Sequence, residues 1–159
     1  MTRFEWAPGF NAAGLQLPVR QTALSAGYDL AAGEDVEIAP TEIRLVRTGV
    51  RVLLERGQFM ALYARSSLAL KRGLLLSNGV GVIDADYYGN ADNGGEILVP
   101  LWNLGLTTAF LVRGERVAQA VFTRFDIVSG ELSPDDKRKG GFGSTSKVDP
   151  PNTLGEAPA

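Results

Sequence analysis

The chain has 159 residues, of which 45% are apolar, and a formal net charge of −2, which suits one domain with a single hydrophobic core. Acidic and basic residues are interspersed, so we expect no nucleic-acid partner and no membrane-binding face. Cysteine and histidine are absent, which excludes disulfides, thiolate nucleophiles, imidazole bases and the usual zinc ligands.

The N-terminal stretch "MTRFEWAPGF" lacks the basic-then-apolar layout of a signal peptide. No apolar run approaches the roughly 20 residues that span a bilayer. We therefore expect a cytoplasmic protein.

Runs of β-prone residues separated by Gly, Pro, Asn and Asp predict an all-β fold, a jelly-roll-like distorted barrel. In "TGVRVLLERG", Val50, Val52 and Leu54 alternate with Arg51 and Leu53, and a period of two is typical of a strand. The expected strands, in chain order, are Val36–Ala39, Glu42–Leu54, Gln58–Ala64, Leu74–Ser77, Gly79–Ile83, Glu96–Leu104, Thr108–Val112 and Arg116–Phe125.

One short helix is predicted among these strands, at Ser66–Arg72. Ser66 or Ser67 can cap its first turn, Leu, Ala and Lys favour the helical state, and Gly73 can end it. We expect the β core to cover residues 1–128. From residue 129 the chain is rich in Gly, Pro, Ser and charge, without apolar periodicity, which predicts a flexible C-terminal arm over residues 129–159.

The arm contains an unusual stretch, "KRKGGFGSTS" (Lys137–Ser146). Glycines let backbone N–H groups converge on an anion, cations neutralise it and hydroxyls add donors, while Phe142 can stack on a flat base. Taken by itself, the stretch can equally be a flexible linker with an incidental phenylalanine.

Five short motifs follow one another along the chain: "AGYDL" (Ala26–Leu30), "RSSLAL" (Arg65–Leu70), "GVIDADYYG" (Gly81–Gly89), "GERVAQ" (Gly114–Gln119) and "GGFGSTS" (Gly140–Ser146). Each is weakly specific alone, but the ordered set resembles the five motifs of the trimeric dUTPase family. The resemblance implies a homotrimer of jelly-roll subunits with shared active sites. It also implies hydrolysis of dUTP to dUMP and pyrophosphate, with Mg²⁺ on the triphosphate.

Three aspartates lie in these motifs. Asp84 matches the family's catalytic carboxylate, which activates the water that attacks the α-phosphorus in line. A positioned carboxylate suits this role in a chain without histidine, although a turn aspartate would have the same local sequence. Asp29 matches an acidic residue near the metal and is expected to act through metal-bound water or subunit contacts, because Mg²⁺ keeps several waters and is held mainly by phosphates. Asp86 is expected to be a hairpin or network residue.

The resemblance also assigns the nucleoside site. Tyr87 matches the residue that packs beneath the deoxyribose and leaves no room for a 2′-hydroxyl; a tyrosine facing the core is the alternative. The backbone of a hairpin over residues 79–84 would recognise uracil, because a wrong base would leave buried polar groups unpaired. The residues expected to bind substrate here are Asn78, Gly81, Val82, Ile83, Tyr87 and Leu98.

The resemblance assigns binding of the triphosphate to the other motifs. Arg65, Ser66 and Ser67 begin the predicted helix, where free N–H groups and the helix dipole favour an anion, although a plain helix start with a surface arginine would look the same. Gln119 matches the family's amide at the phosphates. Arg116 is expected to support the site structurally or electrostatically.

Three features depart from the family pattern. The last motif usually has an arginine three positions before its first glycine, where this chain has Lys137 followed by Arg138, and either cation can contact the γ-phosphate. The stretch "NADNGGE" (Asn90–Glu96) is longer than the usual turn, and a surface loop tolerates such an extension. Ser67 replaces a frequent glycine. The arm residues expected to contact substrate are Lys137, Arg138, Phe142, Gly143 and Ser144.

Two alternatives compete with a dUTPase. The dCTP deaminases have a similar fold and share "RSSL", but Leu70 and Pro100 occupy the positions of their arginine and glutamate, and proline can neither donate nor accept a proton there. A noncatalytic binding jelly roll that kept only the motif shapes is the second alternative. The presence of Asp84, Tyr87 and Phe142 argues against it.

Overall fold

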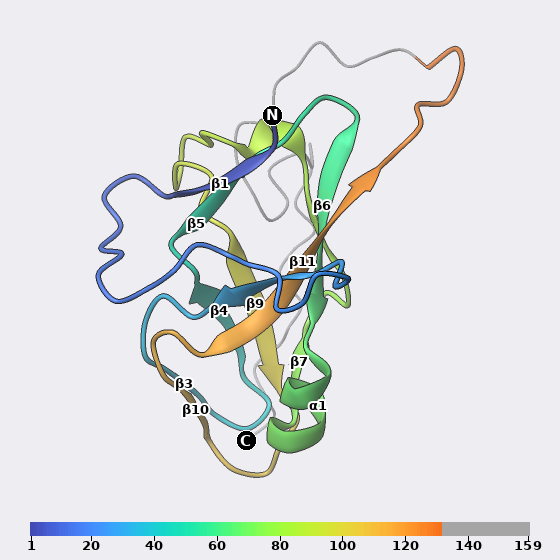
Figure 1. Ribbon diagram of the computed structural model, residues 1–159. Helices are drawn as coiled ribbons and strands as arrows, with labels where there is room; N and C mark the ends of the chain where they lie inside the picture. The colour runs from blue at the N-terminus through green and yellow to red at the C-terminus, as the bar shows by residue number, and fades with distance from the viewer. Residues whose placement is uncertain (132–159) are drawn as a thin grey trace.

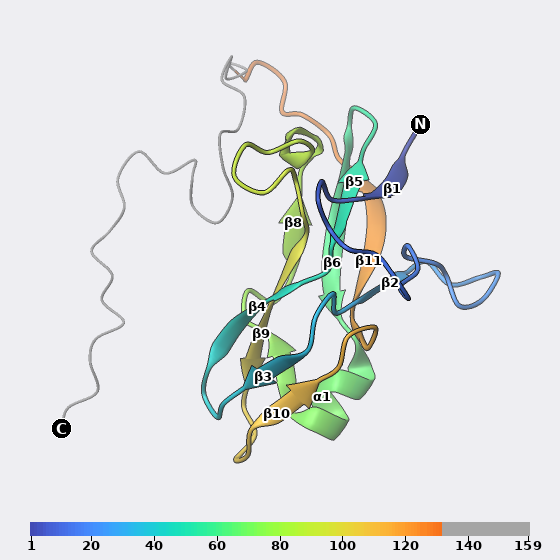
Figure 2. The ribbon, with the colours of Figure 1, turned by 90° about the vertical axis from the view of Figure 1, so that its left-hand side faces the viewer.

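The computed structural model describes residues 1–131 of the chain. Strands dominate, as predicted, and within this range they form four small antiparallel sheets rather than a closed barrel. The long strands β6 and β11 run through the middle of the molecule, with helix α1 at one end (Figures 1 and 2). The arm residues Lys137, Arg138, Phe142, Gly143 and Ser144 lie outside the described residues.

The largest sheet has the order β2-β11-β6-β8. Its strands are β2 (Tyr28–Ala31), β11 (Arg116–Arg124), β6 (Gln58–Ala64) and β8 (Gly81–Ile83). In the register, Gln119 of β11 lies opposite Asp29 on one side and Tyr63 on the other, while Ile83 of β8 lies opposite Met60. This sheet therefore carries residues of four of the five motifs or ends next to them.

The other three sheets complete the core. Strand β9 (Leu98–Asn103) lies between β4 (Ile43–Arg47) and β7 (Leu74–Leu76); β1 (Arg3–Trp6) pairs with β5 (Val50–Leu53), and β3 (Val36–Ile38) with β10 (Ala109–Leu111). All four sheets contribute to one cluster of buried side chains, whose largest fully buried members include Leu30, Ile38, Met60, Leu62, Leu74, Leu101, Leu111 and Val117. Within the described residues, the buried side chains thus form one core.

The single strand predicted over residues 42–54 is in fact two strands, β4 and β5, which belong to different sheets. The alternation of buried residues continues through the break at Val46, Thr48 and Val50, which is why the sequence reads as one strand. The chain turns because Gly49 adopts a φ of 69°. The Thr48 hydroxyl accepts the Val50 N–H and donates to a backbone carbonyl just before β9, which fixes the turn.

Strands β1 and β2 were not predicted. Each has only four residues, and β2 overlaps "AGYDL". An aromatic cluster stabilises them, because the rings of Phe4, Tyr28 and Phe122 lie 5.4–5.5 Å apart between β1, β2 and β11. Such long-range contacts leave no local periodic signal.

Helix α1 (Ser66–Arg72) has the predicted bounds. Gly73 ends it in the left-handed region, with φ 64°, and its N–H donates to the Ala69 carbonyl. The predicted serine cap is wrong: Arg65 is the N-cap residue and no side chain caps the first turn. The hydroxyls of Ser66 and Ser67 are therefore not used to close the helix.

The predicted hairpin over residues 79–84 is also wrong. Strand β7 pairs with β9 whereas β8 pairs with β6, so the exposed turn at Ser77–Val80 crosses between two sheets. After β8 the chain forms a short 3-10 helix, η1 (Ala85–Tyr87), which was not predicted and for which Asp84 is the N-cap residue. Asp86 lies in the first turn of η1 rather than in a hairpin.

Candidate active site

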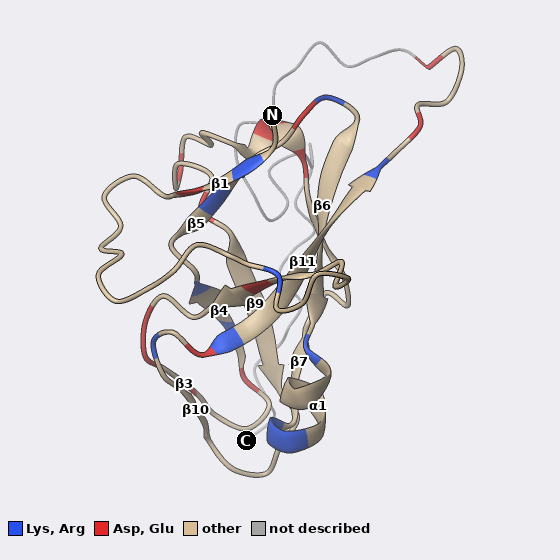
Figure 3. Cartoon of the chain, in the orientation of Figure 1, with Lys and Arg blue, Asp and Glu red and all other residues tan. Residues whose placement is uncertain are grey.

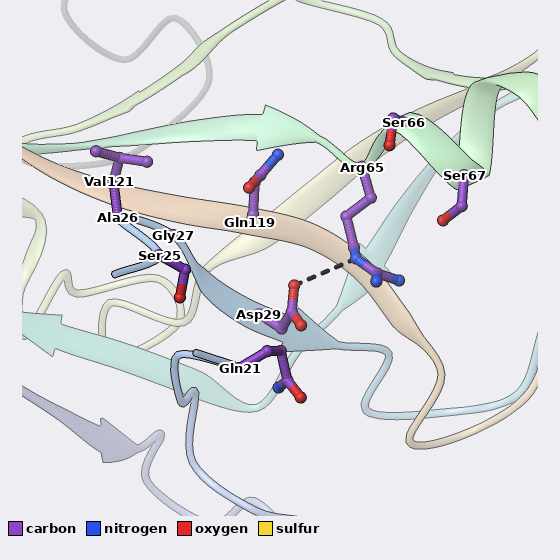
Figure 4. Close-up of a pocket in the computed structure, with 10 residues that line it drawn as sticks. All are labelled: Gln21, Ser25, Ala26, Gly27, Asp29, Arg65, Ser66, Ser67, Gln119 and Val121. Carbon is purple, nitrogen blue, oxygen red and sulfur yellow. Dashed lines mark ion pairs between the residues drawn. The ribbon is translucent and has the colours of Figure 1, made fainter. Parts of the chain in front are cut away.

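A pocket of about 380 Å³ lies where β2, β11 and the start of α1 meet (Figure 4). It brings together the predicted residues of three motifs, which are far apart in the sequence. The lining residues are Gln21, Ser25, Ala26, Gly27, Asp29, Arg65, Ser66, Ser67, Gln119 and Val121. We call Asp29, Arg65, Ser66, Ser67 and Gln119 the pocket group.

An acidic side chain between two basic ones dominates the electrostatics of the pocket. Asp29 is 13% exposed, and its two carboxylate oxygens contact Arg65 Nε at 3.2 Å and Arg116 Nη1 at 3.0 Å. Arg65 also donates to the backbone carbonyl of Arg116 at 3.3 Å. One carboxylate and two guanidiniums leave a net charge of +1, which favours an anion, and the ion pairs hold Arg65 in place before any ligand binds.

Gln119 reaches the pocket from the middle of β11. Its side-chain Nε2 donates to the Ala64 carbonyl at 3.2 Å, at the end of β6. A Cβ atom added at Gly27 would lie 2.7 Å from Gln119 Oε1, so the glycine of "AGYDL" provides the space that this amide occupies. This one contact thus explains why a glycine stands at position 27 opposite the glutamine at position 119.

The first turn of α1 supplies the remaining donors. Figure 4 shows Ser66 and Ser67 beside Arg65, and no acidic residue lies in this turn. Backbone N–H groups at a helix start, serine hydroxyls and a guanidinium together form a donor set suited to phosphate oxygens.

Sequence reasoning missed Gln21 and Ser25 on the rim of the pocket. They lie in a turn closed by reciprocal hydrogen bonds between Thr22 and Ser25, and Arg20 donates to two carbonyls of the same turn. The only sequence signal is the position of these polar residues directly before "AGYDL".

The remaining predicted residues lie on and around β8, which pairs with Met60–Leu62 of β6, and Asp84 and Tyr87 follow its end farther from the pocket. Asp84 is half-buried between β8 and η1, and Tyr87 is only 6% exposed. Around them, Gly81 is buried, Ile83 and Leu98 are half-buried, and Asn78 and Val82 are exposed. We call Asp84, Tyr87 and the residues of β8 the Asp84 group.

The structure separates Asp84 from the pocket group. Ile83 lies opposite Met60 in the register, and Arg65 is five residues further along the chain, about 17 Å of extended backbone. Asp84 follows Ile83 in the direction away from Arg65. Figure 2 shows the same separation, with α1 at the bottom and the segment after β8 at the top.

The described residues contain no group of three or more acidic side chains that could hold a metal ion. Asp29 is the carboxylate that lines the pocket, and both of its oxygens contact guanidiniums. Acidic and basic residues are mixed over the described part of the molecule (Figure 3). None of the helices between residues 1 and 131 is long and apolar enough to cross a membrane.

Comparison with known proteins identifies close relatives. A family model described as dUTPase matches residues 14–146. A deoxyuridine 5′-triphosphate nucleotidohydrolase of Lactococcus lactis is 43% identical over 143 residues, which are 89% of this chain and 95% of that protein. One from Mycobacterium tuberculosis is 42% identical over 138 residues, covering 86% and 84% of the two chains. The crystal structure of dUTPase from Streptococcus mutans matches with a TM-score of 0.77 and 44% identity, covering 80% of this chain and 98% of that one.

Proposed function

Because the chain belongs to the dUTPase family, we propose that it is a dUTP diphosphatase, which hydrolyses dUTP to dUMP and pyrophosphate. The observation that carries this proposal is the pocket group, a net positive site built from three separate motifs and rich in phosphate donors. In this proposal Arg65, the serines of α1 and Gln119 bind the triphosphate.

The proposed chemistry is an in-line displacement at the α-phosphorus. Asp84 accepts a proton from a water molecule as its oxygen bonds to phosphorus, the bond to the α,β-bridging oxygen breaks, and pyrophosphate leaves. Asp84 precedes η1 at the end of a paired strand, which restricts its backbone and supports a positioning role. Asp84→Asn tests the role of Asp84 as the base, because an amide cannot accept this proton.

The separation of the two groups bears on the proposed assembly. Asp84 must lie within hydrogen-bond reach of the water beside the α-phosphorus, whereas roughly 17 Å of extended backbone separate Arg65 from the β6 position opposite Ile83 of the same subunit. We therefore propose a homotrimer in which each active site joins the pocket group of one subunit to the Asp84 group of another. The arm over residues 129–159 would complete the site with Lys137 or Arg138, Phe142, Gly143 and Ser144.

Mg²⁺ fits this site as part of the substrate. The described residues offer no carboxylate cage, so the triphosphate would bring the ion and Asp29 would approach it only through water. Bound in this way, Mg²⁺ neutralises charge on the phosphates. The main role of Asp29 is then to hold Arg65 and Arg116 in position.

Specificity for dUTP is proposed to come from the Asp84 group. The backbone at Gly81–Ile83, with Asn78, would recognise uracil, and the Tyr87 ring would exclude a 2′-hydroxyl. The proposal does not depend on a hairpin at this segment, because β8 is held by pairing with β6 rather than with β7.

Pyrophosphate release tests the proposal. With Mg²⁺ present, dUTP should be hydrolysed far faster than dCTP, dTTP or UTP. Ammonia release from dCTP would instead indicate a deaminase, and binding of dUTP without turnover would indicate a noncatalytic protein.

A further inference from the structure

The long stretch Asn90–Glu96 surrounds the hydroxyl of Tyr87. Asn93 Nδ2 donates to Tyr87 Oη at 2.9 Å, and Tyr87 Oη donates to the Glu96 carbonyl at 3.2 Å. Asn93 Nδ2 also contacts the Glu96 carbonyl at 3.0 Å. The hydroxyl therefore has its partners inside this loop, and the far end of the ring is held as firmly as its backbone end.

The loop is itself ordered by hydrogen bonds. The Gly94 N–H donates to the Asn90 carbonyl at 2.7 Å, and the Gly95 N–H donates to Asn93 Oδ1 at 3.0 Å. Gly95 adopts a φ of 84°, and a Cβ atom there would lie 2.7 Å from the Tyr87 carbonyl. The loop backbone thus packs directly on Tyr87, and Asn93 contacts both the loop and the ring.

Glu96 anchors the end of the loop to the core. Its side chain is buried, at 4% exposure, and accepts the Gly49 N–H at 2.9 Å and a bidentate contact from Arg47. The hydrogen bond and charge of Glu96 raise the pKa of Arg47. The carbonyl that accepts from Tyr87 therefore belongs to a residue whose movement would break its ion pair with the half-exposed Arg47.

We propose that the loop Asn90–Glu96 sets sugar specificity, with Asn93 as the positioning residue that fixes the Tyr87 ring. This inference rests on the proposed role of Tyr87 against the 2′-hydroxyl. A ring that excludes one oxygen atom must resist tilting, and a ring hydrogen-bonded at its far end resists it better than a ring held by packing alone. The extra length of the loop is what brings Asn93 to Tyr87.

Asn93→Asp tests the proposal with little change in shape. It replaces the Nδ2 donor by a carboxylate oxygen, which can only accept from Tyr87 and repels the Glu96 carbonyl, but keeps the oxygen that accepts from Gly95. Asp92→Asn is the matched control, since Asp92 is exposed on the same loop and makes only a backbone contact to Asn90. We expect Asn93→Asp to raise the ratio of kcat/KM for UTP to that for dUTP about threefold to tenfold, the equivalent of one buried hydrogen bond, and Asp92→Asn to leave it unchanged.

A double-mutant cycle separates positioning from general destabilisation. Tyr87→Phe removes the hydroxyl, so Asn93→Asp should change the UTP/dUTP ratio little further in that background. An equal loss of kcat/KM for both substrates in Asn93→Asp, with the ratio at its wild-type value, would overturn the inference, as would full additivity in the cycle.

Tyr87→Ala tests the proposed role of Tyr87 separately from that of Asn93. If Tyr87→Ala keeps wild-type discrimination against UTP, the proposed role of Tyr87 itself is wrong. If Tyr87→Ala loses discrimination while Asn93→Asp keeps it, Tyr87 retains its role and only the positioning function of Asn93 fails.

Discussion

At the scale of single residues, Asp29 holds two arginine side chains in position. Its carboxylate lies between Arg65 and Arg116 at 3.2 and 3.0 Å. The family resemblance predicts that Asp29 lies near the metal and acts through metal-bound water or subunit contacts, and the described contacts add a role as a support for Arg65. Arg65 is then available to phosphate in one orientation, because the ion pair has already restricted its rotamers.

Asp29→Asn should therefore raise the KM for dUTP more than it lowers kcat, since Arg65 would lose its orientation in the ground state. The free energy of unfolding should fall by about 1–3 kcal/mol, as for loss of charge-assisted hydrogen bonds at a partly buried site. Steady-state kinetics and urea unfolding on the same preparation check both. An unchanged KM would show that Arg65 is positioned without Asp29.

Glu5 gives the chain a pH-dependent contact. Tyr88 Oη donates to Glu5 Oε2 at 2.7 Å, and Arg3 and Arg51 contact the same carboxylate. The hydrogen bond from Tyr88, followed by the one from Arg3, lowers the pKa of Glu5, and the bond to Glu5 raises the pKa of Tyr88. A depressed carboxyl pKa stabilises the folded state above its ordinary value of 4.5, and this contribution disappears as the pH falls through the folded value.

The stability advantage of wild type over Glu5→Gln should accordingly shrink as the pH is lowered from 6 to about 3. Urea midpoints for the two proteins, measured across this range, provide the test. Parallel curves would mean that the pKa of Glu5 does not differ between the folded and unfolded states.

At the scale of elements, the turn between β4 and β5 connects two sheets and also receives the Phe10 ring. The ring stacks on Trp6 and lies between the guanidiniums of Arg47 and Arg113, with centroid distances of 5.5–5.8 Å. A Cβ atom at Gly49 would lie 2.1 Å from this ring. Glycine is thus required at position 49 for two reasons. The backbone has a positive φ, and the Phe10 ring leaves no room for a Cβ atom.

Gly49→Ala should destabilise the protein clearly more than Gly57→Ala. Gly57 has a similar φ, 76°, but nothing lies within 4 Å of a Cβ atom there, so its replacement reports the backbone cost alone, about 1 kcal/mol. The additional loss at Gly49, from displacement of Phe10, should be about 1 kcal/mol or more. Denaturant midpoints of the two variants measure it, and equal losses would show that Phe10 moves aside without cost.

The elements that could be predicted are those with local signals. Strand β6 and helix α1 have the predicted bounds, because apolar runs and Gly73 mark them within the sequence itself. The break at Gly49 could not be seen, since inward-facing residues continue to alternate across it. The crossing between β7 and β8 could not be seen either, because turn residues mark a change of direction but not which strand becomes the next partner.

At the scale of the whole molecule, the separation of the two groups becomes the central feature. Asp29, Arg65 and Gln119, which belong to three different motifs, line one pocket. The motifs contained no information on distance, so the separation of Asp84 from Arg65 emerged only from the register of β8 on β6. The proposed dUTPase activity and this separation together require that one subunit supply Asp84 and another supply Arg65.

Mixing two inactive variants under subunit exchange tests this requirement most directly. Asp84→Asn keeps an intact pocket group, and Arg65→Ala keeps an intact Asp84 group. In a cyclic trimer that contains both variants, one of the three sites receives Asp84 and Arg65 intact, and random mixing makes about three quarters of the trimers mixed, so activity should return to about a quarter of wild type. With exchange verified by native mass spectrometry, this recovery is the predicted result, and mixtures as inactive as their parents would contradict the shared-site account.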